Sequence, residues 1–422
     1  MKNYDVIIIG AGLAGLSLGS ELAKEFNILV IEKGRIKNEH KTWTAEEALI
    51  NNAGLGQFIT ARFNGGNFKF LDKEKIFVHD KLATVDDVAI LDYFTGLIRK
   101  NSESKILENC EFLDAHEENI TGLTIKTTKG LFSSKLIIDC SGVNSPLVAK
   151  HELNDKIFYN PVYGGIYDVR SGESDNFAAE IVTTDYPISW FETFPANKDQ
   201  TLVYTFQYTN NPVEPLSLKP IHEYQIKNCH LKDKLKGKKM VREVYGIIPM
   251  GSMKKNAVNG IFFFGDTNLI GAPLAGTGFT NIIQHYKKIA KHLSINLTNS
   301  TLKEENLNYT YDRTEQINRD IQSIIGMILI NARLEEVGLF FDLIKDLPDR
   351  ITANMIYLRL NIEEISILIK TLVAKFGLKK LAGILPKKEY MYIAKEIFKT
   401  AENIVVENVI EDLFNIQNTK SV

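Results

Sequence analysis

Three glycines at fixed spacing stand between an apolar strand and a helix near the N-terminal end of this sequence. In YDVIIIGAGLAGLSL, Val6 to Ile9 form the short, continuously apolar run that is typical of a buried parallel strand. Gly10, Gly12 and Gly15 follow as G-x-G-x-x-G. The first glycine permits a tight turn, the second lets a pyrophosphate approach the backbone, and the third lets helix and strand pack closely. The chain is therefore predicted to begin with a dinucleotide-binding unit, in an α/β fold with a Rossmann-like domain.

An acidic residue follows the next predicted strand. The strand over residues 28–31 runs into Glu32, 17 residues after Gly15, where dinucleotide-binding folds carry an acid that accepts hydrogen bonds from a ribose. The N-terminus of the intervening helix offers free N–H groups and the positive end of its dipole to phosphates. The alternative is a glycine-rich turn in an unrelated α/β domain, but the strand, the helix and the acid together favour dinucleotide binding.

A second glycine-bearing turn lies about 250 residues further along, in FFFGDTNLIGAPLAGTGFTNII (residues 262–283). A domain that binds only a nicotinamide nucleotide does not need such a segment, whereas flavoproteins with a late returning strand use it to complete an FAD site. Asp266 follows the apolar strand and is expected to hold the ribitol of FAD. Pro273 fixes the loop, and a helix that opens near Gly276–Gly278 would direct the positive end of its dipole at the flavin. The sequence therefore predicts FAD.

A third segment, SSKLIIDCSGVNSPL (residues 133–147), predicts a strand and a turn between these two. In flavin hydroxylases this place often carries Asp-Gly with a downstream Arg, whereas this chain has Ser141-Gly142 and Val148. These differences argue against a hydroxylase that takes hydride directly from NADPH, and an ordinary strand and turn remains the alternative. The residues expected to contact FAD are Gly10, Gly12, Leu13, Ala14, Gly15, Glu32, Lys33, Gly142, Gly265, Asp266, Pro273, Gly276, Thr277, Gly278 and Phe279.

The composition argues against several other classes of protein. A net charge of −2 over 422 residues argues against a nucleic-acid binder that relies on excess positive charge. Cys110, Cys140 and Cys229 lack the spacing of a metal site or of a disulfide framework. No uninterrupted apolar run reaches the ~18 residues of a membrane-spanning helix. A cytoplasmic protein without a metal site is expected.

Four stretches of the chain resemble the lycopene-cyclase and geranylgeranyl-reductase group of FAD enzymes. They are YDVIIIGAGLAGLSL, HKTWT (residues 40–44), REVYGIIPMGSM (residues 242–253) followed by GDTNLIGAPLAGTGF, and FFDLIKDLPDRITANMIY (residues 340–357). The first is shared with many flavoproteins. The second is similar to a Trp-containing stretch of lycopene cyclases, the third to their Ile-Pro-Met-Gly segment before the flavin helix, and the fourth to their C-terminal helices. The four occur in the same order and together span most of the chain.

This resemblance implies a p-hydroxybenzoate-hydroxylase-like fold in three parts. A discontinuous FAD-binding domain would comprise residues 1–155 and 255–300, an inserted antiparallel β-sheet substrate domain residues 156–254, and a helical C-terminal region residues 301–422. The resemblance also implies an apolar isoprenoid or polyene small molecule as substrate and reduced flavin as the working form of the cofactor. NAD(P)H is a candidate electron donor.

The resemblance leaves the proton donor open. Lycopene cyclases carry a pair of acidic residues in a strand that matches residues 194–208, but the matching positions here read YTFQ. The other candidate acids are Glu46, Glu47 and Glu192, and Glu192 is favoured because it lies in the aromatic stretch YPISWFETFP. A carboxyl group buried in an apolar pocket has a raised pKa and can deliver a proton. A register shift of one residue would place Glu192 on the outer face instead.

Two tryptophans complete the set of catalytic candidates, which are Glu192, Trp190 and Trp43. Trp190 and Phe194 are expected to line an apolar tunnel, and Trp43 is a candidate to cover the flavin. Ordinary packing in a hydrophobic core is the alternative for each of these aromatic residues.

The C-terminal region predicts amphipathic helices. A basic set of residues surrounds the apolar positions of one of them: Lys375, Lys379, Lys380, Lys387 and Lys388. Such a helix could rest on an anionic membrane surface. The favoured alternative is a helix that packs on the rest of the protein and exposes a solvated Lys face.

Three functions remain open at this point. The first is an FAD enzyme that cyclises or reduces an isoprenoid or polyene. The second is a flavin-dependent monooxygenase or halogenase on an aromatic or polyene substrate, which would consume oxygen. The third is a flavin-binding protein without turnover, such as a lipid carrier.

Overall fold

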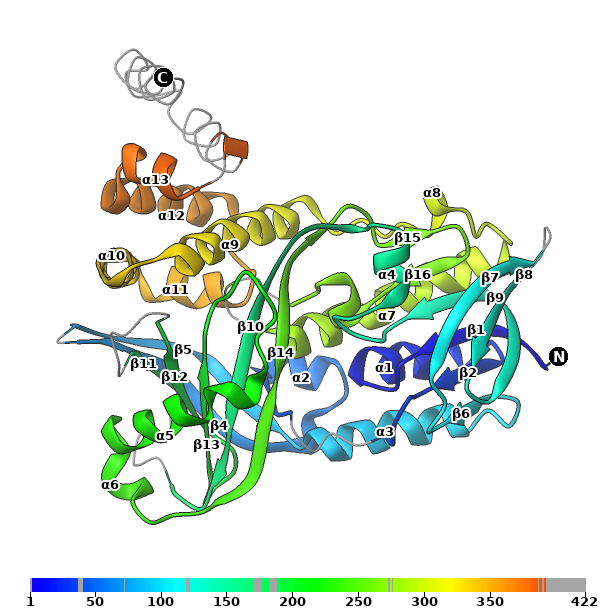
Figure 1. The fold of residues 1–422 in the computed structure, drawn as a ribbon, viewed down its shortest axis with the longest axis horizontal. Helices are drawn as coiled ribbons and strands as arrows, with labels where there is room; N and C mark the ends of the chain where they lie inside the picture. Colours follow the sequence, from blue (N-terminus) through cyan, green and yellow to red (C-terminus); the bar gives the residue numbers. More distant parts are fainter. Residues whose placement is uncertain are drawn as a thin grey trace.

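The computed structural model describes residues 2–36, 41–71, 73–118, 122–170, 177–181, 188–271, 274, 276–385, 387–388 and 391. These residues form two eight-stranded sheets, here called sheet A and sheet B, with helices packed against both (Figure 1). The predicted α/β class is therefore confirmed.

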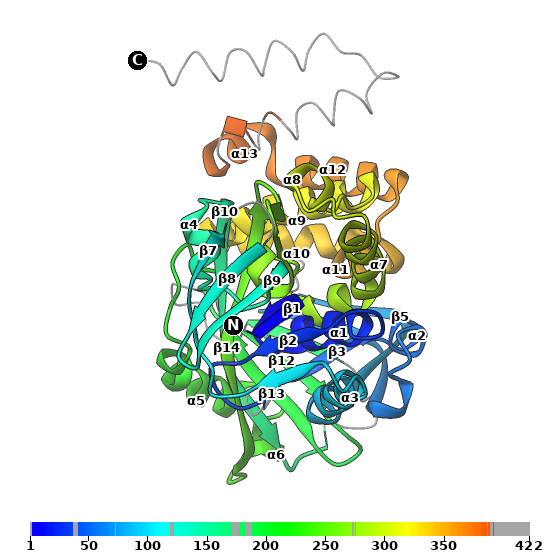
Figure 2. The ribbon, with the colours of Figure 1, turned by 90° about the vertical axis from the view of Figure 1, so that its right-hand side faces the viewer.

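Sheet A has the strand order β15-β16-β9-β1-β2-β6, with β8 paired to β9 and β7 paired to β8. Strand β1 is parallel to β2 and β9, and β9 is parallel to β16. Val6 and Ile8 of β1 share a core with helices, whereas Ile7 and Ile9 share another core with residues of β7 and β8. Figure 2 shows β7 and β8 on one side of β1 and α1 on the other. Burial on both faces explains the continuous apolar run. The strands are β1 (Lys2–Ile9), β2 (Ile28–Ile31), β6 (Lys105–Leu107), β7 (Phe112–Glu118), β8 (Gly122–Thr127), β9 (Gly130–Asp139), β15 (Ala257–Val258) and β16 (Ile261–Phe263).

Sheet B has the strand order β14-β10-β13-β12-β11-β4-β5-β3. Its neighbouring strands are antiparallel except for β11 and β4, which are parallel. The sheet extends beyond the expected segment 156–254, because residues 43–85 supply three of its strands. The strands are β3 (Trp43–Glu46), β4 (Ile59–Phe70), β5 (Lys73–Val85), β10 (Asn154–Tyr167), β11 (Phe177–Ile181), β12 (Trp190–Pro195), β13 (Thr201–Phe206) and β14 (Met240–Met253).

Helices cover one face of each sheet. On sheet A, apolar residues of α1, α3 and α7 form one core with β1 and β2. On sheet B, helices α9 to α12 bury Ile325, Phe341 and Leu368 against aromatic residues such as Phe70 and Trp190. The helices are α1 (Leu13–Leu22), α2 (Glu47–Asn52), α3 (Asp87–Arg99), α4 (Pro146–Lys150), α5 (Lys219–Asn228), α6 (Lys232–Leu235), α7 (Gly278–Thr298), α8 (Glu304–Leu307), α9 (Arg313–Asn331), α10 (Leu334–Asp346), α11 (Asp349–Ile356), α12 (Ile362–Phe376) and α13 (Leu378–Ile384).

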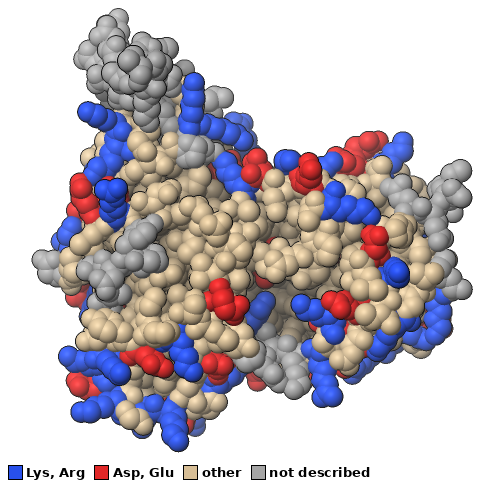
Figure 3. All heavy atoms as spheres, in the orientation of Figure 1, with Lys and Arg blue, Asp and Glu red and all other residues tan. Residues whose placement is uncertain are grey.

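The basic residues of the C-terminal helices are partly engaged within the protein. Lys375 forms an ion pair with Asp346, and Lys380 forms one with Glu335, so both side chains bind back to α10 or its end. This arrangement favours the packed helix over a free basic face. Lys and Arg are interspersed with Asp and Glu over the face shown in Figure 3. Within the described part of the chain, no helix combines the length and the apolar character needed to cross a membrane.

Candidate active site

A cavity of ≈ 500 Å³ lies where the two sheets meet. At one end it is bounded by the N-terminal turns of α1 and α7, and at the other by aromatic residues of sheet B and by helices α10 and α11. Of the residues predicted to bind FAD, those that line it are Gly10, Gly12, Leu13, Ala14, Glu32, Gly142, Asp266, Gly276, Thr277, Gly278 and Phe279. The three catalytic candidates, Trp43, Trp190 and Glu192, line the same cavity. The structure therefore brings both predicted sets together.

The three glycines of the first motif have three different surroundings. Gly10 has a φ of +99°, and a Cβ atom there would lie 2.4 Å from the carbonyl oxygen of Cys140. A Cβ atom on Gly15 would lie 2.0 Å from the carbonyl oxygen of Gly10. A Cβ atom on Gly12 would meet nothing within 4 Å. Gly10 and Gly15 thus permit close packing, whereas Gly12 leaves open space beside the first turn of α1, as a bound pyrophosphate requires.

Glu32 is oriented by the backbone. Its Oε2 accepts a hydrogen bond from the Ala11 N–H at 2.9 Å, and its Oε1 accepts one from the Gly34 N–H at 3.0 Å. The carboxylate therefore lies at the cavity in a fixed orientation, with lone pairs left for a ribose hydroxyl. The predicted Lys33 is exposed and lies outside the lining. Arg35, which sequence reasoning missed, lines the cavity.

The second glycine-bearing turn forms the opposite wall of this end. A Cβ atom on Gly265, whose φ is +79°, would lie 2.5 Å from the Cβ of Ala14, so this glycine lets the turn pack on α1. Asp266 lines the cavity, with its Oδ2 3.7 Å from Lys41 Nζ. The predicted helix begins at Gly278, and the buried hydroxyl oxygen of Thr277 has no hydrogen-bond partner among the described residues. Pro273 lies outside the described residues.

These features fit FAD. The space beside Gly12 and the unpaired Thr277 hydroxyl border the same cavity, and the N-termini of two helices open toward it. Helix N-termini stabilise negative charge, so α1 would hold the pyrophosphate and α7 the flavin. Glu32 would accept hydrogen bonds from the ribose and Asp266 from the ribitol.

The segment after β9 adds a third contact to this end. Asp139 Oδ1 accepts hydrogen bonds from the Ser141 N–H at 2.9 Å and from the Ser141 hydroxyl at 2.6 Å. The Gly142 N–H donates to Thr267 Oγ1 at 2.8 Å, which ties this turn to the turn after β16. Gly142 lines the cavity. The Asp139 side chain thus shapes the turn in which Ser141-Gly142 replaces the Asp-Gly of flavin hydroxylases.

The far end of the cavity is aromatic. Trp190 stacks on Phe206, with ring centroids 6.2 Å apart, and contacts Tyr208 edge-on at 6.4 Å. Phe177 and Phe194 lie 4.8 Å apart. Trp43 stacks on Phe279 at 5.3 Å, which places it at the boundary with the FAD end. Other apolar residues of this part of the lining are Phe68, Phe77, Leu82, Val162, Leu202, Leu329, Phe340, Ile344, Met355 and Ile356.

Glu192 places one carboxyl group in this aromatic part. Strand β12 pairs with β13 so that Glu192 lies opposite Tyr204, and both line the cavity. Burial raises the pKa of Glu192 to about 7, although a hydrogen bond from Tyr204 opposes the shift. Burial also raises the pKa of Tyr204, Tyr208 and Tyr357, and the nearby Glu192 charge contributes to each shift. Close to neutral pH the carboxyl group can therefore exist in either form.

The other candidate acids serve as structural ion-pair partners. Glu46 is buried and forms an ion pair with Arg359. Glu47 forms an ion pair with Arg62, with Glu47 Oε1 2.8 Å from Arg62 Nε. Neither of them lines the cavity. Their positions remove both from the set of groups that can reach a bound substrate.

The strand that carries the acid pair in lycopene cyclases is β13. Its Thr205 points away from the cavity, with Oγ1 2.9 Å from His222 Nδ1, whereas Phe206 lines the cavity. Among the described residues, the carboxyl group that lines the aromatic part of the cavity lies on the adjacent strand, at Glu192. Tyr204, Tyr208 and Tyr357 were missed by sequence reasoning. For the first two, the alternation of residues along 201–208 was the available signal.

The fold and the cavity define an FAD-dependent enzyme with a p-hydroxybenzoate-hydroxylase-type fold. The chain belongs to the lycopene cyclase protein family, because the sequence model of that family matches residues 5–377. A search of curated proteins found no match.

Solved structures share the fold at low sequence identity. A geranylgeranyl bacteriochlorophyll reductase-like protein from Thermoplasma acidophilum is 15% identical to this chain, with a TM-score of 0.69. The superposition covers 91% of this chain and 100% of the Thermoplasma chain. PqsL, a probable FAD-dependent monooxygenase from Pseudomonas aeruginosa, has 12% identity and a TM-score of 0.62, covering 81% and 100%. The halogenase PltM in complex with phloroglucinol and FAD has 14% identity and a TM-score of 0.62, covering 93% and 99%.

Proposed function

We propose that this enzyme cyclises or reduces an apolar isoprenoid or polyene chain, with Glu192 as the group that exchanges a proton with the substrate. The observation that carries the proposal is the position of one carboxyl group, with a pKa raised to about 7, in an aromatic cavity continuous with the FAD end. Among the described residues that line the aromatic part, Glu192 supplies the carboxyl group.

Cyclisation needs a proton donor and a proton acceptor. The protonated Glu192 would give its proton to one carbon of a double bond, which leaves a carbocation on the other carbon. A second double bond of the same chain would attack that cation and close a ring. The resulting carboxylate would then remove a proton from a carbon next to the new cation. The product therefore has the mass of the substrate, and Glu192 returns to its starting form.

The walls of the cavity suit such a cation. The aromatic residues Trp190, Phe206 and Tyr208 line the space, and an aromatic face attracts a cation by about 0.5–2 kcal/mol. The Tyr204 hydroxyl donates to Glu192 and keeps the carboxylate oriented between proton transfers. The apolar lining excludes water, which would otherwise capture the cation.

When held in reduced form by the N-termini of α1 and α7, FAD would provide negative charge beside the cavity for a cyclisation, or a hydride for the reduction of a double bond. In the second case Glu192 would deliver a proton to the adjacent carbon, and the product would gain two hydrogens. NAD(P)H is the proposed source of electrons for either reaction. The mass of the product distinguishes the two reactions.

The test uses the FAD-loaded enzyme under anaerobic conditions, with FAD chemically reduced and polyene or isoprenoid substrates supplied in detergent. Turnover without oxygen is expected, and Glu192→Gln is expected to lower kcat by about 10²–10³ because proton transfer is lost. Glu47→Gln, which changes an acid outside the cavity, serves as the matched control. Full activity of Glu192→Gln would remove Glu192 from the mechanism, and a product that forms only with oxygen uptake would overturn the proposal in favour of a monooxygenase or halogenase.

A further inference from the structure

The backbone of one residue beside the cavity, Leu274, is held from two sides. The Leu274 N–H donates to Gln322 Oε1 at 3.1 Å, and the Leu274 carbonyl accepts a hydrogen bond from the Tyr208 hydroxyl at 2.6 Å. The Leu274 side chain lines the cavity, two residues before Gly276. Gln322 belongs to α9 and Tyr208 follows the end of β13, so the two contacts join the helical region to the aromatic wall through Leu274.

The Tyr208 hydroxyl approaches the Leu274 carbonyl from the aromatic part of the cavity. Its ring packs edge-on against Phe206 at 5.8 Å and against Trp190 at 6.4 Å, and it lines the cavity. A substrate that fills the aromatic part would therefore touch a ring whose hydroxyl is bonded to the Leu274 carbonyl.

The Gln322 side chain approaches the Leu274 N–H from α9. It is 1% exposed, and its Nε2 donates to the carbonyl of Met355, whose side chain also lines the cavity. The side-chain amide of Gln322 therefore has a partner for its oxygen, the Leu274 N–H, and a partner for its nitrogen, the Met355 carbonyl on α11. Removing a buried partner leaves the other group unsatisfied, so these contacts constrain the backbone on each side.

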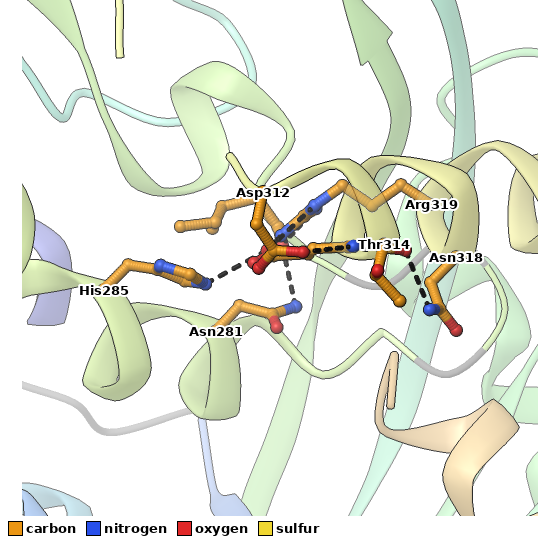
Figure 4. Close-up of polar contacts among 8 residues, drawn as sticks. Asn281, His285, Asp312, Thr314, Asn318 and Arg319 are labelled. Carbon is orange, nitrogen blue, oxygen red and sulfur yellow. Dashed lines mark hydrogen bonds and ion pairs between the residues drawn. The ribbon is translucent and has the colours of Figure 1, made fainter. Parts of the chain in front are cut away.

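A second contact of α9 fixes the same turn further upstream (Figure 4). The Ile270 carbonyl accepts hydrogen bonds from Arg319 Nη1 at 3.0 Å and from Asn281 Nδ2 at 2.9 Å. Arg319 is itself oriented by Glu315, which lies 3.1 Å from its Nη2 and 3.0 Å from His285 Nε2 on α7. Burial raises the pKa of Glu315, but His285 and Arg319 lower it below its ordinary value overall, so the carboxylate stays ionised. The described part of this turn is therefore anchored at Ile270 and at Leu274.

We propose that Tyr208 and Gln322 are positioning residues that link the aromatic part of the cavity to the backbone beside the flavin. The proposal rests on the assignment of FAD to the end of the cavity bounded by α7. Because Leu274 lies between the two side chains and two residues before Gly276, loss of either hydrogen bond lets the Leu274 backbone shift, and the surroundings of the flavin change with it. A substrate that moves the Tyr208 ring would act on the flavin through the same bond.

The experiment compares FAD-loaded Tyr208→Phe and Gln322→Leu with wild type, first without substrate. Each variant is expected to raise the FAD dissociation constant by about two- to tenfold, the effect of one lost hydrogen bond. Each is also expected to shift the visible flavin spectrum in the same direction. Tyr224→Phe removes an exposed hydroxyl outside the cavity lining, and Gln316→Leu removes an exposed amide on α9; neither should change FAD binding or the spectrum. Wild-type affinity and spectrum in both test variants would overturn the proposal.

The second measurement adds geranylgeraniol, an apolar isoprenoid alcohol, and follows binding by quenching of tryptophan fluorescence. In wild type, binding is expected to shift the flavin spectrum, and Tyr208→Phe is expected to bind the alcohol without that shift. Binding to wild type without any spectral change would overturn the link. Failure of the alcohol to bind would count against the proposed substrate class, and the comparison without substrate would then decide on the positioning residues alone. Neither outcome depends on the activity of the Glu192→Gln variant, which tests the proposed function separately.

Discussion

The two ends of the cavity are built by different means. At the FAD end, backbone geometry determines the shape: Gly10 and Gly15 allow close approach, and the first turn of α1 presents N–H groups to open space. At the aromatic end, side chains determine it, and one carboxyl group on β12, Glu192, is the proposed proton donor. Backbone geometry leaves a local mark in the sequence, whereas the choice of which side chains face a cavity depends on strand register. The difference predicts that substitutions at one end will alter FAD binding and stability, and those at the other end catalysis and its pH dependence.

The largest effect is expected for Gly10→Ala. Gly10 has a φ of +99°, and the new Cβ would lie 2.4 Å from the carbonyl oxygen of Cys140. We expect a loss of about 3 kcal/mol in the free energy of unfolding and no retention of FAD during purification. Denaturant unfolding and the visible spectrum of the purified protein measure the two effects. A yellow protein of wild-type stability would contradict the role given to backbone geometry.

A pH series separates the aromatic end from the FAD end. Because the pKa of Glu192 is raised to about 7, the folded protein binds this proton more tightly than the unfolded chain does. Its contribution to stability is therefore complete below about pH 4.5 and is lost as the pH rises through 7, by about 3 kcal/mol. Burial lowers the pKa of His222 to about 4, so the contribution of His222 to stability is present above its ordinary pKa and is lost as the pH falls through 4. The quantity to follow is hence the difference in unfolding free energy between wild type and Glu192→Gln, which should change between pH 4.5 and 7.

Gly12→Ala sharpens the comparison within the FAD end itself. The new Cβ would meet no protein atom within 4 Å, so the unfolding free energy of the FAD-free protein should stay within about 0.5 kcal/mol of wild type. The same Cβ would occupy the space assigned to the pyrophosphate, and the FAD dissociation constant should rise about tenfold. Titration of the FAD-free protein with FAD checks this. Unchanged affinity would mean that the pyrophosphate does not approach Gly12.

The smallest effect is expected for Trp43→Leu, at the boundary between the two ends. The Trp43 ring stacks on Phe279 at 5.3 Å, and such a pair contributes about 0.5–1.5 kcal/mol. A modest loss of thermal stability is expected, with FAD still bound. A large loss of turnover with stability intact would instead assign Trp43 a direct part in catalysis.

The sequence predicted the FAD end in detail because each of its features is local. The strand, glycine motif and acid lie within about 30 residues, and the second helix was placed near Gly276–Gly278 and begins at Gly278. Sequence reasoning could not separate glycines that pack from glycines that leave space, since Gly10 and Gly265 meet atoms of Cys140 and Ala14, which are distant from them in the chain. Lys33 was included on position alone and is exposed, outside the cavity lining.

The aromatic end was only partly predictable. Glu192 and Trp190 were chosen from an aromatic strand, but their exposure to the cavity depends on the pairing of β12 with β13. Glu46 was a reasonable candidate until its ion pair with Arg359, more than 300 residues away, became visible. Gln322 gave no signal in the sequence, because its importance arises from contacts with Leu274 and Met355 that only the tertiary structure creates.

The chain alternates repeatedly between the two sheets, and this has a consequence for biosynthesis. Sheet A needs β16 (Ile261–Phe263) and sheet B needs β14 (Met240–Met253), so neither is complete until most of the polypeptide has left the ribosome. Domains ordinarily fold one after another during translation, but here two half-built sheets with unpaired edges must wait together. Expression at low temperature or with added chaperones should therefore raise the yield of native protein more than any optimisation of a single domain boundary.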